Sequence, residues 1–293
     1  GTLAHGAVGK SILLMTEAVA MASGLPLLGT QPRGTFRVVY WNGEDPQDEL
    51  DRRFAAIRKQ YDVPAKATGD RLFVDSGRTL PINIVTLDPK TRMAMPKDVD
   101  LIVEALIADR IDVLTIDPSV ASHSVPENQN EMAEKVAQAW NDVAERANVA
   151  VHLAHHAVKA RGREVEAMDF RGGGASLAKL RHLRVLNRMT GDEAKKAGIV
   201  DDQAWRHIRS DDGGKPNLVP PSGAVWYRMV SVDLENADVK RDGFEHAESD
   251  VIGVPVPWTF QDKPRIHVWL SANEAREVHR LMGDEVWRKS SQS

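Results

Sequence analysis

The chain of 293 residues contains no cysteine, which excludes disulfide bonds and metal sites built on thiolates. No apolar run is long enough to span a membrane, and no secretory signal peptide is visible. Acidic and basic residues nearly balance, with a formal net charge of -4, so any surface for nucleic acid has to be a local patch or a channel. We therefore expect a cytoplasmic protein with one large α/β domain and an appendage, or with two small domains.

A glycine-rich segment near the start of the sequence carries the most informative motif. Residues 4–11 read AHGAVGKS, which matches the phosphate-binding pattern G-x-x-x-x-G-K-[ST] except that Ala4 replaces the first glycine. In this pattern backbone N–H groups converge on phosphate oxygens, the lysine neutralises the β- and γ-phosphates, and the hydroxyl ligates Mg²⁺. The motif predicts a site for ATP and Mg²⁺. The residues expected to contact ATP are Gly6, Ala7, Val8, Gly9, Lys10, Ser11 and Ile12.

The sequence on both sides of this motif fits a phosphate-binding loop. Residues 2–4 read as the end of a strand, and the segment after Ser11 is an apolar helix that ends at Gly24, a natural C-terminal glycine. A strand, a glycine loop and a helix in this order place the positive end of the helix at the phosphates. The alternative is a glycine-rich turn before an ordinary buried helix.

Strand and helix patterns alternate through most of the chain, which predicts an α/β fold with a mostly parallel twisted sheet and helices on both faces. From about residue 205 shorter strands with Pro and Gly turns predict either an antiparallel extension of the sheet or a small accessory region. Residues 76–97 read as irregular. The expected strands are 36–41, 72–74, 112–116, 149–154 and 183–186, and the expected helices are 46–60, 98–109 and 127–147.

Carboxylates follow two of the expected strands. Asp117 ends the strand 112–116, where a carboxylate faces the crevice in which parallel sheets bind ligands, and in a phosphate-loop protein it would hold Mg²⁺. Glu44 follows the strand 36–41, where it could orient or deprotonate the water that attacks the γ-phosphate. The alternatives are an ordinary strand-end Asp117, and a helix cap at Asp45 that is compatible with catalysis by Glu44.

Two further segments are polar where the fold predicts a ligand. His155 and His156 follow the strand 149–154 and could sense the γ-phosphate by hydrogen bonding, although plain polar residues at a strand end are as good an interpretation. The next loop is basic and glycine-ended, and such loops can follow a phosphate backbone; a solvated surface loop is the alternative. Its candidate DNA-binding residues are Lys159, Arg161, Arg163 and Arg171. Arg181 comes next and could act as an arginine finger toward a neighbouring subunit.

Taken in order, several segments resemble one family. The segments are AHGAVGKS, VVYWNGEDPQDELDRRF, VLTIDPS, HLAHHAVK, FRGGGASLAKLRHLRVLNRM and DDGGKPNLVPP. Over residues 1–235 the chain is similar to the RecA-like ATPases of the plasmid RepA hexameric helicase type, which occur in plasmids, phages and integrated elements.

The resemblance implies roles for individual residues. It implies catalytic roles for Lys10, Glu44, Asp117, His156 and Arg181, metal binding by Ser11 and Asp117, cofactor binding by Arg53, and a polar motif at Lys215 and Asn217. It implies a homo-oligomeric, hexameric ring that hydrolyses ATP and moves along single-stranded DNA, without a membrane. A RecA-like loader, recombination mediator or regulatory ATPase that does not unwind DNA is the alternative.

The resemblance also suggests a division of the chain. We expect a RecA-like core in residues 1–235, whose first strand begins upstream of this sequence. Residues 236–293 would form a C-terminal extension with a helix near 271–283, leading to a winged-helix-like end that lies beyond this sequence.

Overall fold

Nine strands form one twisted sheet in the described part of this computed structural model, which comprises residues 1–126, 129–157, 163–170, 177, 179–212, 223–237 and 248–261. The order across the sheet is β11-β10-β9-β8-β1-β7-β6-β2-β3, and the strands from β8 to β3 run parallel. The predicted mostly parallel α/β fold is therefore confirmed. The strands are β1 (Thr2–Ala4), β2 (Val38–Asn42), β3 (Leu72–Ser76), β6 (Val113–Asp117), β7 (Ala150–His156), β8 (Arg184–Arg188), β9 (His207–Asp212), β10 (Val225–Asp233) and β11 (Val251–Trp258).

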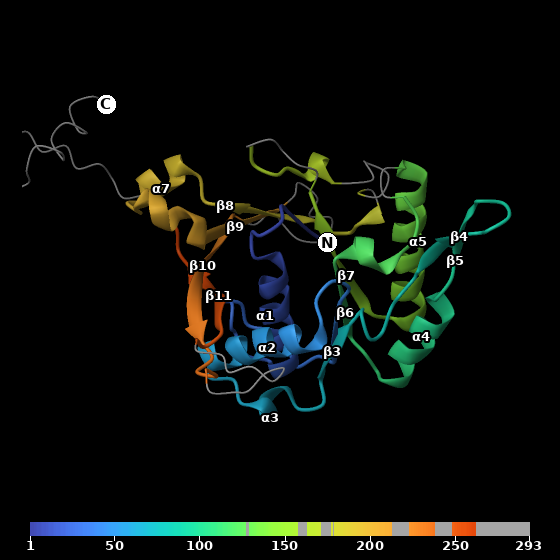
Figure 1. Cartoon of the computed structure of the whole chain (residues 1–293), viewed down its shortest axis with the longest axis horizontal. Helices are drawn as coiled ribbons and strands as arrows, with labels where there is room; N and C mark the ends of the chain where they lie inside the picture. The colour runs from blue at the N-terminus through green and yellow to red at the C-terminus, as the bar shows by residue number, and fades with distance from the viewer. Residues whose placement is uncertain are drawn as a thin grey trace, which may run out of the picture.

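Helices cover both faces of the parallel part of the sheet (Figure 1). α1 and α2 pack on one face, and α4 and α5 pack against each other on the other face. The helices and short 3-10 turns are α1 (Lys10–Ser23), α2 (Gln47–Gln60), α3 (Ala65–Thr68), α4 (Val99–Ala108), η1 (Ser119–Ser122), α5 (Asn130–Ala147), η2 (Ala167–Asp169), α7 (Gly191–Ala197) and η3 (Asp201–Arg206). No helix in the described ranges is both long and apolar enough to cross a membrane.

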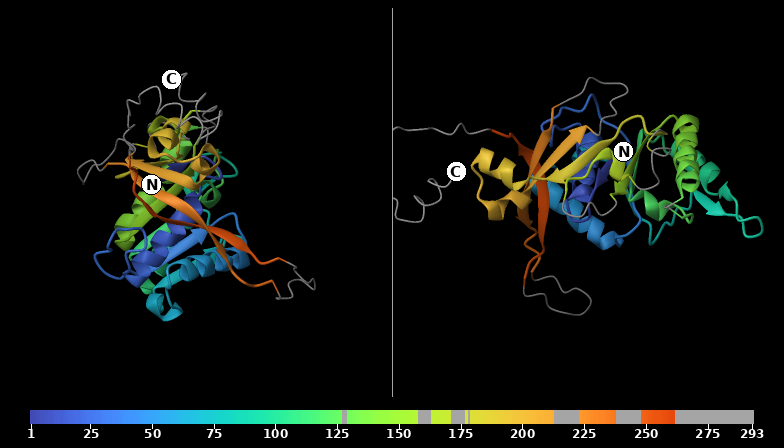
Figure 2. Two further views of the ribbon diagram at one scale, coloured as in Figure 1. Left: turned by 90° about the vertical axis from the view of Figure 1, so that its left-hand side faces the viewer. Right: turned by 90° about the horizontal axis from the view of Figure 1, so that it is seen from above.

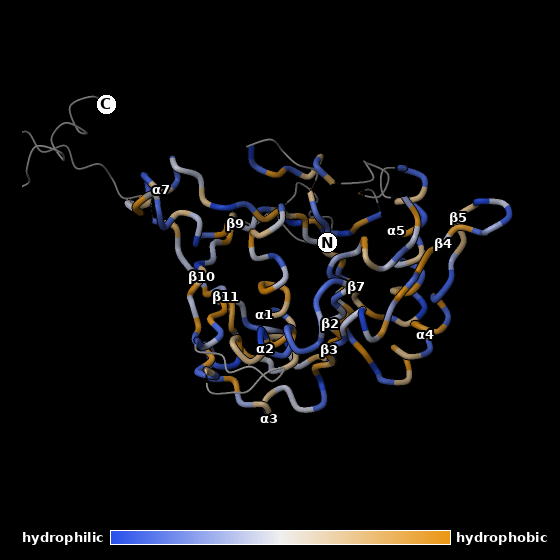
Figure 3. The backbone as a smooth tube through the Cα atoms, viewed as in Figure 1, coloured by the Kyte–Doolittle hydropathy of each residue, from blue (hydrophilic) through white to orange (hydrophobic). Residues whose placement is uncertain are grey.

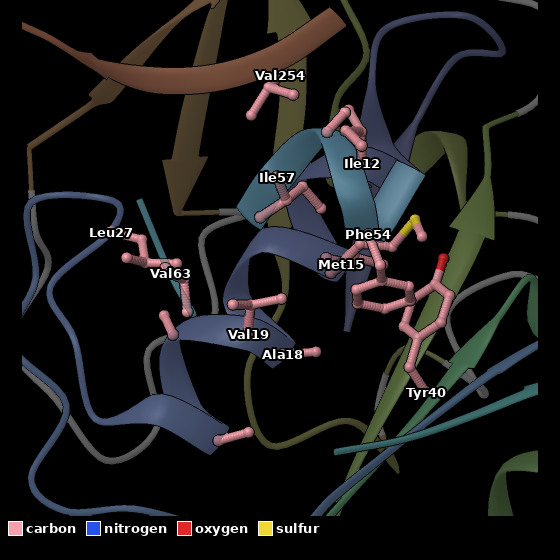
Figure 4. Close-up of a cluster of buried hydrophobic side chains, with 14 of the residues drawn as sticks. Ile12, Met15, Ala18, Val19, Leu27, Tyr40, Phe54, Ile57, Val63 and Val254 are labelled. Atoms are coloured by element: carbon pink, nitrogen blue, oxygen red, sulfur yellow. The ribbon is translucent and has the colours of Figure 1, made fainter. Parts of the chain in front are cut away.

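Strand β2, next to the edge strand β3, shows how the sequence divides the core into two halves. Side chains alternate between the faces of a strand, so Tyr40 and Trp41 point in opposite directions. Tyr40 packs with Phe54 in the cluster under α1 and α2, where the two rings meet edge to face at 5.7 Å (Figure 4). Trp41 packs instead in the cluster under α4 and α5. Both side chains are almost fully buried, so a one-residue slip of β2 would exchange the two cores.

The helix α1 is apolar on nearly all sides because it is enclosed on nearly all sides. It begins after Gly9 and ends at Gly24, and both glycines adopt the left-handed backbone that L-residues disfavour, with φ of 101° and 74°. Val254 of β11 is fully buried in the same cluster as Met15 and Val19 of α1 (Figure 4). The helix therefore lies between the parallel sheet, α2 and the last strands of the sheet.

The strands after residue 205 extend the same sheet in the antiparallel direction, which decides between the two possibilities left open by the sequence. β9 pairs with β8, β10 with β9, and β11 with β10. The last two strands turn away from the parallel strands and run beside α1 and α2 (Figure 2). The sheet therefore continues past the predicted division at residue 235.

The prediction that residues 76–97 are irregular is wrong. Two short strands, β4 (Val85–Leu87) and β5 (Ala94–Pro96), form an antiparallel hairpin there. Asp88 stabilises its turn by accepting hydrogen bonds from the backbone N–H groups of Lys90 and Thr91, at 2.9 and 2.7 Å. The turn is hydrophilic, whereas the strands are more hydrophobic (Figure 3). Strands of three residues are too short to show the alternation that reveals a strand in sequence.

Some predictions concern residues outside the described ranges. These are the DNA-binding roles of Lys159, Arg161 and Arg171, the polar motif at Lys215 and Asn217, and the helix near residues 271–283.

Candidate nucleotide-binding site

The predicted site residues converge at the carboxyl edge of the parallel strands. Ala4, the last residue of β1, pairs with His156 of β7, and Asn42 of β2 pairs with Asp117 of β6. Four strand ends therefore meet at the edge where open α/β sheets bind their ligands. The loop after β1 leads from this edge into α1.

The loop between β1 and α1 has the geometry of a phosphate-binding loop. Ala7 and Gly9 have positive φ angles of 62° and 101°, which turn the backbone sharply before α1. Ala4 lies in β1 and is fully buried, so no glycine is needed at that position of the motif. Arg188 of β8 donates a hydrogen bond to the carbonyl oxygen of Ala7 and ties the loop to the neighbouring strand. The replacement of the first glycine therefore leaves the loop intact.

Lys10 and Asp117 form a buried ion pair at the centre of the site. Their side chains are 5% and 1% exposed. Asp117 also accepts a hydrogen bond of 2.8 Å from the hydroxyl of Tyr40. Burial by itself raises the pKa of the Asp117 carboxyl, but the Lys10 ammonium and the hydrogen bonds from Lys10, Ser11 and Tyr40 outweigh burial and lower that pKa below its usual value. Asp117 is therefore an anion, and the Lys10 side chain lies directly beside it.

Ser11 and Asp117 also fit the predicted metal. Ser11, at the start of α1, is close enough to the Asp117 carboxylate at the end of β6 to help lower the pKa of that carboxyl, so their two side-chain oxygens lie near each other. Mg²⁺ prefers such hard oxygen ligands, and it typically takes one or two from the protein and the rest from phosphates and water. A nucleotide that drew Lys10 toward its phosphates would free this carboxylate.

Glu44 and His156 face each other at the rim of the site. The Glu44 carboxylate lies 3.9 Å from Nε2 of His156, and the Glu44 side chain is 57% exposed. Asn42 fixes the start of the Glu44 segment, because its side-chain oxygen accepts hydrogen bonds from the backbone N–H groups of Glu44 and Asp45, at 2.9 and 2.8 Å. A solvent-accessible carboxylate in this position is able to hold a water molecule.

Arg53 lies in the same cleft and is fixed by two carboxylates. Its guanidinium donates to Asp45 at 2.7 Å and to Glu49 at 2.9 Å. The cleft has a volume of about 440 Å³, within the range of ~300–1,000 Å³ typical of small-molecule sites. It is lined by residues 5–7 and 9–12 of the loop and α1, by Glu49 and Arg53 of α2, by His156 of β7, by Met229 of β10, and by residues 251–253 of β11.

Two predicted residues near the cleft point elsewhere. The Val8 side chain packs with Leu13 and Ile208 in a separate core cluster, so only its backbone is available to phosphate. His155 stacks on Phe170 with ring centroids 4.2 Å apart, and its buried Nε2 makes no hydrogen bond. Burial, together with nearby positive charges, lowers the pKa of His155 well below its ordinary value. His156, which lines the cleft, is therefore the histidine placed to meet a nucleotide.

The one candidate DNA-binding residue within the described ranges is engaged in a local ion pair. Arg163 donates to Asp169 at 2.8 Å, and Asp169 is only 9% exposed. The Arg163 side chain itself is 55% exposed. Arg163 thus stabilises the short turn η2, and its predicted contact with DNA stays a prediction.

Arg181 lies at the opposite edge of the sheet from Lys10. Thr2 pairs with Arg184 at the amino ends of β1 and β8, and Arg181 lies before this point in the chain. The neighbouring His182 accepts a hydrogen bond of 2.6 Å from the amino group of Gly1. Because the phosphate loop leaves from the carboxyl end of β1, Arg181 and this loop lie toward opposite ends of the strand.

Comparison with known proteins agrees with this geometry. A family model described as an AAA domain matches residues 2–162, more than half of the chain. The chain belongs to this AAA domain family. Its fold is that of a RecA-like P-loop ATPase, and one similar solved structure is that of a DnaB-like replicative helicase and its interactions with primase. That match has a TM-score of 0.52 and 11% sequence identity and covers 78% of this chain.

The AAA domain match supports an ATPase, whereas the structural match supports the fold. The structural match covers 54% of the helicase chain, so this chain spans about half the length of that protein. Identity of 11% supports the fold alone. The comparisons therefore show membership of the AAA domain family and the fold.

Sequence reasoning missed several residues that shape the site. Tyr40 is hidden inside an apolar strand, although a buried tyrosine needs a hydrogen-bond partner and its hydroxyl finds Asp117. Asn42 carried a visible signal, because Asn two and three residues before a turn often accepts backbone hydrogen bonds. Arg188 and Met229 carried no such signal in the sequence, because only the order of the strands in the sheet brings them to the phosphate loop.

The buried ion pair makes a first prediction, about stability without nucleotide. Lys10→Met leaves Asp117 as a buried, unpaired anion, and we expect a loss of about 2–4 kcal/mol in unfolding free energy. Asp117→Asn alone leaves Lys10 unpaired and should also destabilise. The double variant should recover most of the loss, which urea unfolding of all four proteins would measure as a coupling energy. Purely additive losses would mean that the two charges do not stabilise each other.

Two buried histidines make a second prediction, about pH. Burial, with nearby positive charges, lowers the pKa of His152 and of His155 far below the ordinary 6.5. Each ring is then neutral when folded, so the unfolded chain binds more protons below pH 6.5 and stability falls with falling pH. We expect a loss of roughly 1 kcal/mol per histidine between about pH 7.5 and pH 5.5. Urea unfolding at several pH values should show that the stability of His155→Phe depends less steeply on pH than that of the unaltered protein. An unchanged pH dependence would mean that His155 does not contribute to it.

Proposed function

We propose that the chain is the motor of a Mg²⁺-dependent ATPase that assembles into a hexameric ring and translocates on single-stranded DNA, as a replicative helicase of a plasmid, phage or integrated element. The AAA domain family and the helicase-like fold support the ATPase. The ordered motifs that resemble the plasmid RepA type support the finer assignment. An enzyme that uses ATP on DNA would work in the cytoplasm.

One observation carries the proposal of a ring. Lys10, Ser11 and Asp117 lie at the carboxyl edge of the sheet, whereas Arg181 is exposed at the amino edge. A finger arginine completes a site by stabilising the charge of the transferring phosphoryl group. Since Arg181 lies away from the phosphate loop of its own chain, we infer that it acts on a site in a neighbouring subunit. Repetition of this head-to-tail contact closes into a ring when the rotation between subunits permits.

The geometry of the cleft supports a direct hydrolytic mechanism. Lys10 would leave Asp117 for the β- and γ-phosphates, and Mg²⁺ on Ser11 and Asp117 would neutralise charge on the phosphate oxygens. Glu44 would take a proton from a water whose oxygen bonds to the γ-phosphorus, while the bond from that phosphorus to the β–γ bridging oxygen breaks and ADP leaves. His156, next to Glu44, is placed to register the presence of the γ-phosphate.

Activity with and without single-stranded DNA tests the proposal. We expect ATP hydrolysis that single-stranded DNA stimulates, in an assembly whose measured mass corresponds to a ring, and we expect strand displacement from the full-length protein. Glu44→Gln should lower turnover by a factor of about 10²–10⁴ while nucleotide binding persists, because only the general base is lost. DNA-stimulated hydrolysis without unwinding by the full-length protein would favour a loader or regulatory ATPase. Unchanged turnover in Glu44→Gln would refute the role of Glu44.

A mixing experiment tests the shared site. Arg181→Ala and Lys10→Ala should each be inactive alone, because each lacks one half of every interface. Mixed rings contain some interfaces with an intact Lys10 from one subunit and an intact Arg181 from the next, so part of the activity should return. Native mass spectrometry would verify that the subunits have mixed. Verified mixed rings without any recovered hydrolysis would contradict a role for Arg181 across the interface.

A further inference from the structure

Two buried polar residues of β2, Tyr40 and Asn42, have no role in the hydrolytic mechanism. Their side chains are 0% and 1% exposed. The two residues are two positions apart on one strand, so both side chains project from the same face of the sheet. In the register of the parallel strands, Asn42 lies beside Asp117 at the end of β6. Together they contact Asp117 and the segment that carries Glu44.

Tyr40 holds one oxygen of the Asp117 carboxylate, and Lys10 holds the other. The Tyr40 hydroxyl donates a hydrogen bond of 2.8 Å to Oδ2, whereas the Lys10 ammonium donates to Oδ1. The Tyr40 ring is itself fixed edge to face against Phe54 in the core (Figure 4). If Lys10 moved toward a phosphate, Oδ1 would become available while Oδ2 stayed bonded. A carboxylate held at one oxygen is restrained from turning, so Oδ1 would remain the oxygen that faces the phosphate loop.

Asn42 holds the backbone from which Glu44 projects. Its side-chain oxygen accepts hydrogen bonds from the backbone N–H groups of Glu44 and Asp45, at 2.9 and 2.8 Å. The NH₂ group of the same amide remains as a donor. Burial raises the pKa of the Tyr40 hydroxyl, whereas the Asn42 side chain is close enough to that hydroxyl to lower its pKa. Asn42 is therefore a neighbour of Tyr40 at one end of its amide and of the Glu44 backbone at the other.

The backbone between Asn42 and Glu44 is closely packed. The N–H group of Gly43 donates a hydrogen bond of 3.0 Å to the carbonyl oxygen of Asp117. A Cβ placed on Gly43 would lie 2.2 Å from Cβ of Ala121, so this position has no room for a side chain. A short segment packed in this way passes a shift of Asn42 on to Glu44.

We propose that Tyr40 and Asn42 are positioning residues that join Asp117 to Glu44 through one buried chain of hydrogen bonds. Tyr40 orients the Asp117 carboxylate, and Asn42 sets the backbone of Glu44 relative to the Tyr40 hydroxyl. The inference rests on the proposed function, in which both carboxylates serve one bound nucleotide. Neither positioning residue lines the cleft, so loss of the chain slows hydrolysis more than it weakens nucleotide binding.

Amide hydrogen exchange in the nucleotide-free protein tests this chain directly. Asn42→Ala removes the acceptor of the Glu44 and Asp45 N–H groups, so these two amides should exchange about tenfold faster. Tyr40→Phe removes one hydroxyl that bonds to neither amide, yet it should speed exchange of the same two amides roughly threefold, because Asn42 loses its neighbour. NMR would measure both amides individually. Unchanged exchange at Glu44 and Asp45 in Tyr40→Phe would overturn the proposal.

Steady-state ATP hydrolysis supplies a second readout. Tyr40→Phe and Asn42→Ala should each lower kcat by about tenfold, which corresponds to ~1.4 kcal/mol in the barrier. The Kd of a non-hydrolysable ATP analogue should change by less than about twofold, since the phosphate loop is intact. Asn42→Ser should recover part of the loss, because a serine hydroxyl also accepts backbone N–H groups in a turn. Weaker analogue binding with unchanged kcat would overturn the positioning roles.

A second genetic background tests whether Asn42 acts through Glu44. In Glu44→Gln, the further change Asn42→Ala should lower the residual turnover by less than about twofold, because the group that Asn42 positions is already lost. An equal loss in both backgrounds would overturn the proposal.

Tyr227→Phe is the matched control. Tyr227 is another buried tyrosine, but it lines a cavity with Glu17 and Arg184 and lies outside the cleft. This variant should match the unaltered protein in amide exchange at Glu44 and in kcat. Failure of the proposed function looks different: the unaltered protein would then not hydrolyse ATP, and the exchange rates alone would decide whether the chain of hydrogen bonds exists.

Discussion

The buried pair of Lys10 and Asp117 is the constraint on which the rest of the site depends. An ammonium and a carboxylate so poorly exposed are tolerated only as partners, because either ion alone would carry a large desolvation cost. The pair fixes the start of α1 against the end of β6 and holds the phosphate loop open. In the proposed function a nucleotide would draw Lys10 away from Asp117, since Lys10 cannot neutralise Asp117 and a triphosphate equally well. Binding would then replace one internal ion pair by contacts with phosphates and metal.

The parts of this arrangement that sequence could predict are those set by local chemistry. In the sequence, Gly9 and the lysine after it indicate the loop. Asp117 and His156 are candidate site residues because each follows a predicted strand. Parallel strands bring such positions together whatever their distance in the chain, which is why these residues lie at the same edge of the sheet. Strand order was not predictable in the same way. Met229 and Arg188 reach the phosphate loop only because β8, β9 and β10 follow β1 in the sheet.

Failures of prediction have equally specific causes. The hairpin of β4 and β5 has strands too short to show alternation, and an Asp88 turn holds it together instead of a hydrophobic pattern. His155 and His156 look equivalent in sequence, but neighbouring residues of a strand face opposite ways. One histidine consequently packs on Phe170 and stays neutral, and the other lines the cleft. Arg163 looks like a free cation in a basic loop, and the structure adds an ion pair with Asp169 that the sequence did not show, while its predicted contact with DNA stays a prediction.

The helix α2 joins the Glu44 segment to the last strand of the sheet. Before it lies Glu44, whose segment Asn42 holds, and within its first turns Arg53 reaches back to Asp45. Just after it lies Tyr61, whose hydroxyl donates a hydrogen bond to the carbonyl oxygen of Pro255 in β11. A rigid helix held at both of its ends keeps the rim of the cleft and β11 at fixed positions relative to each other, so the antiparallel extension of the sheet is part of the framework that positions Glu44.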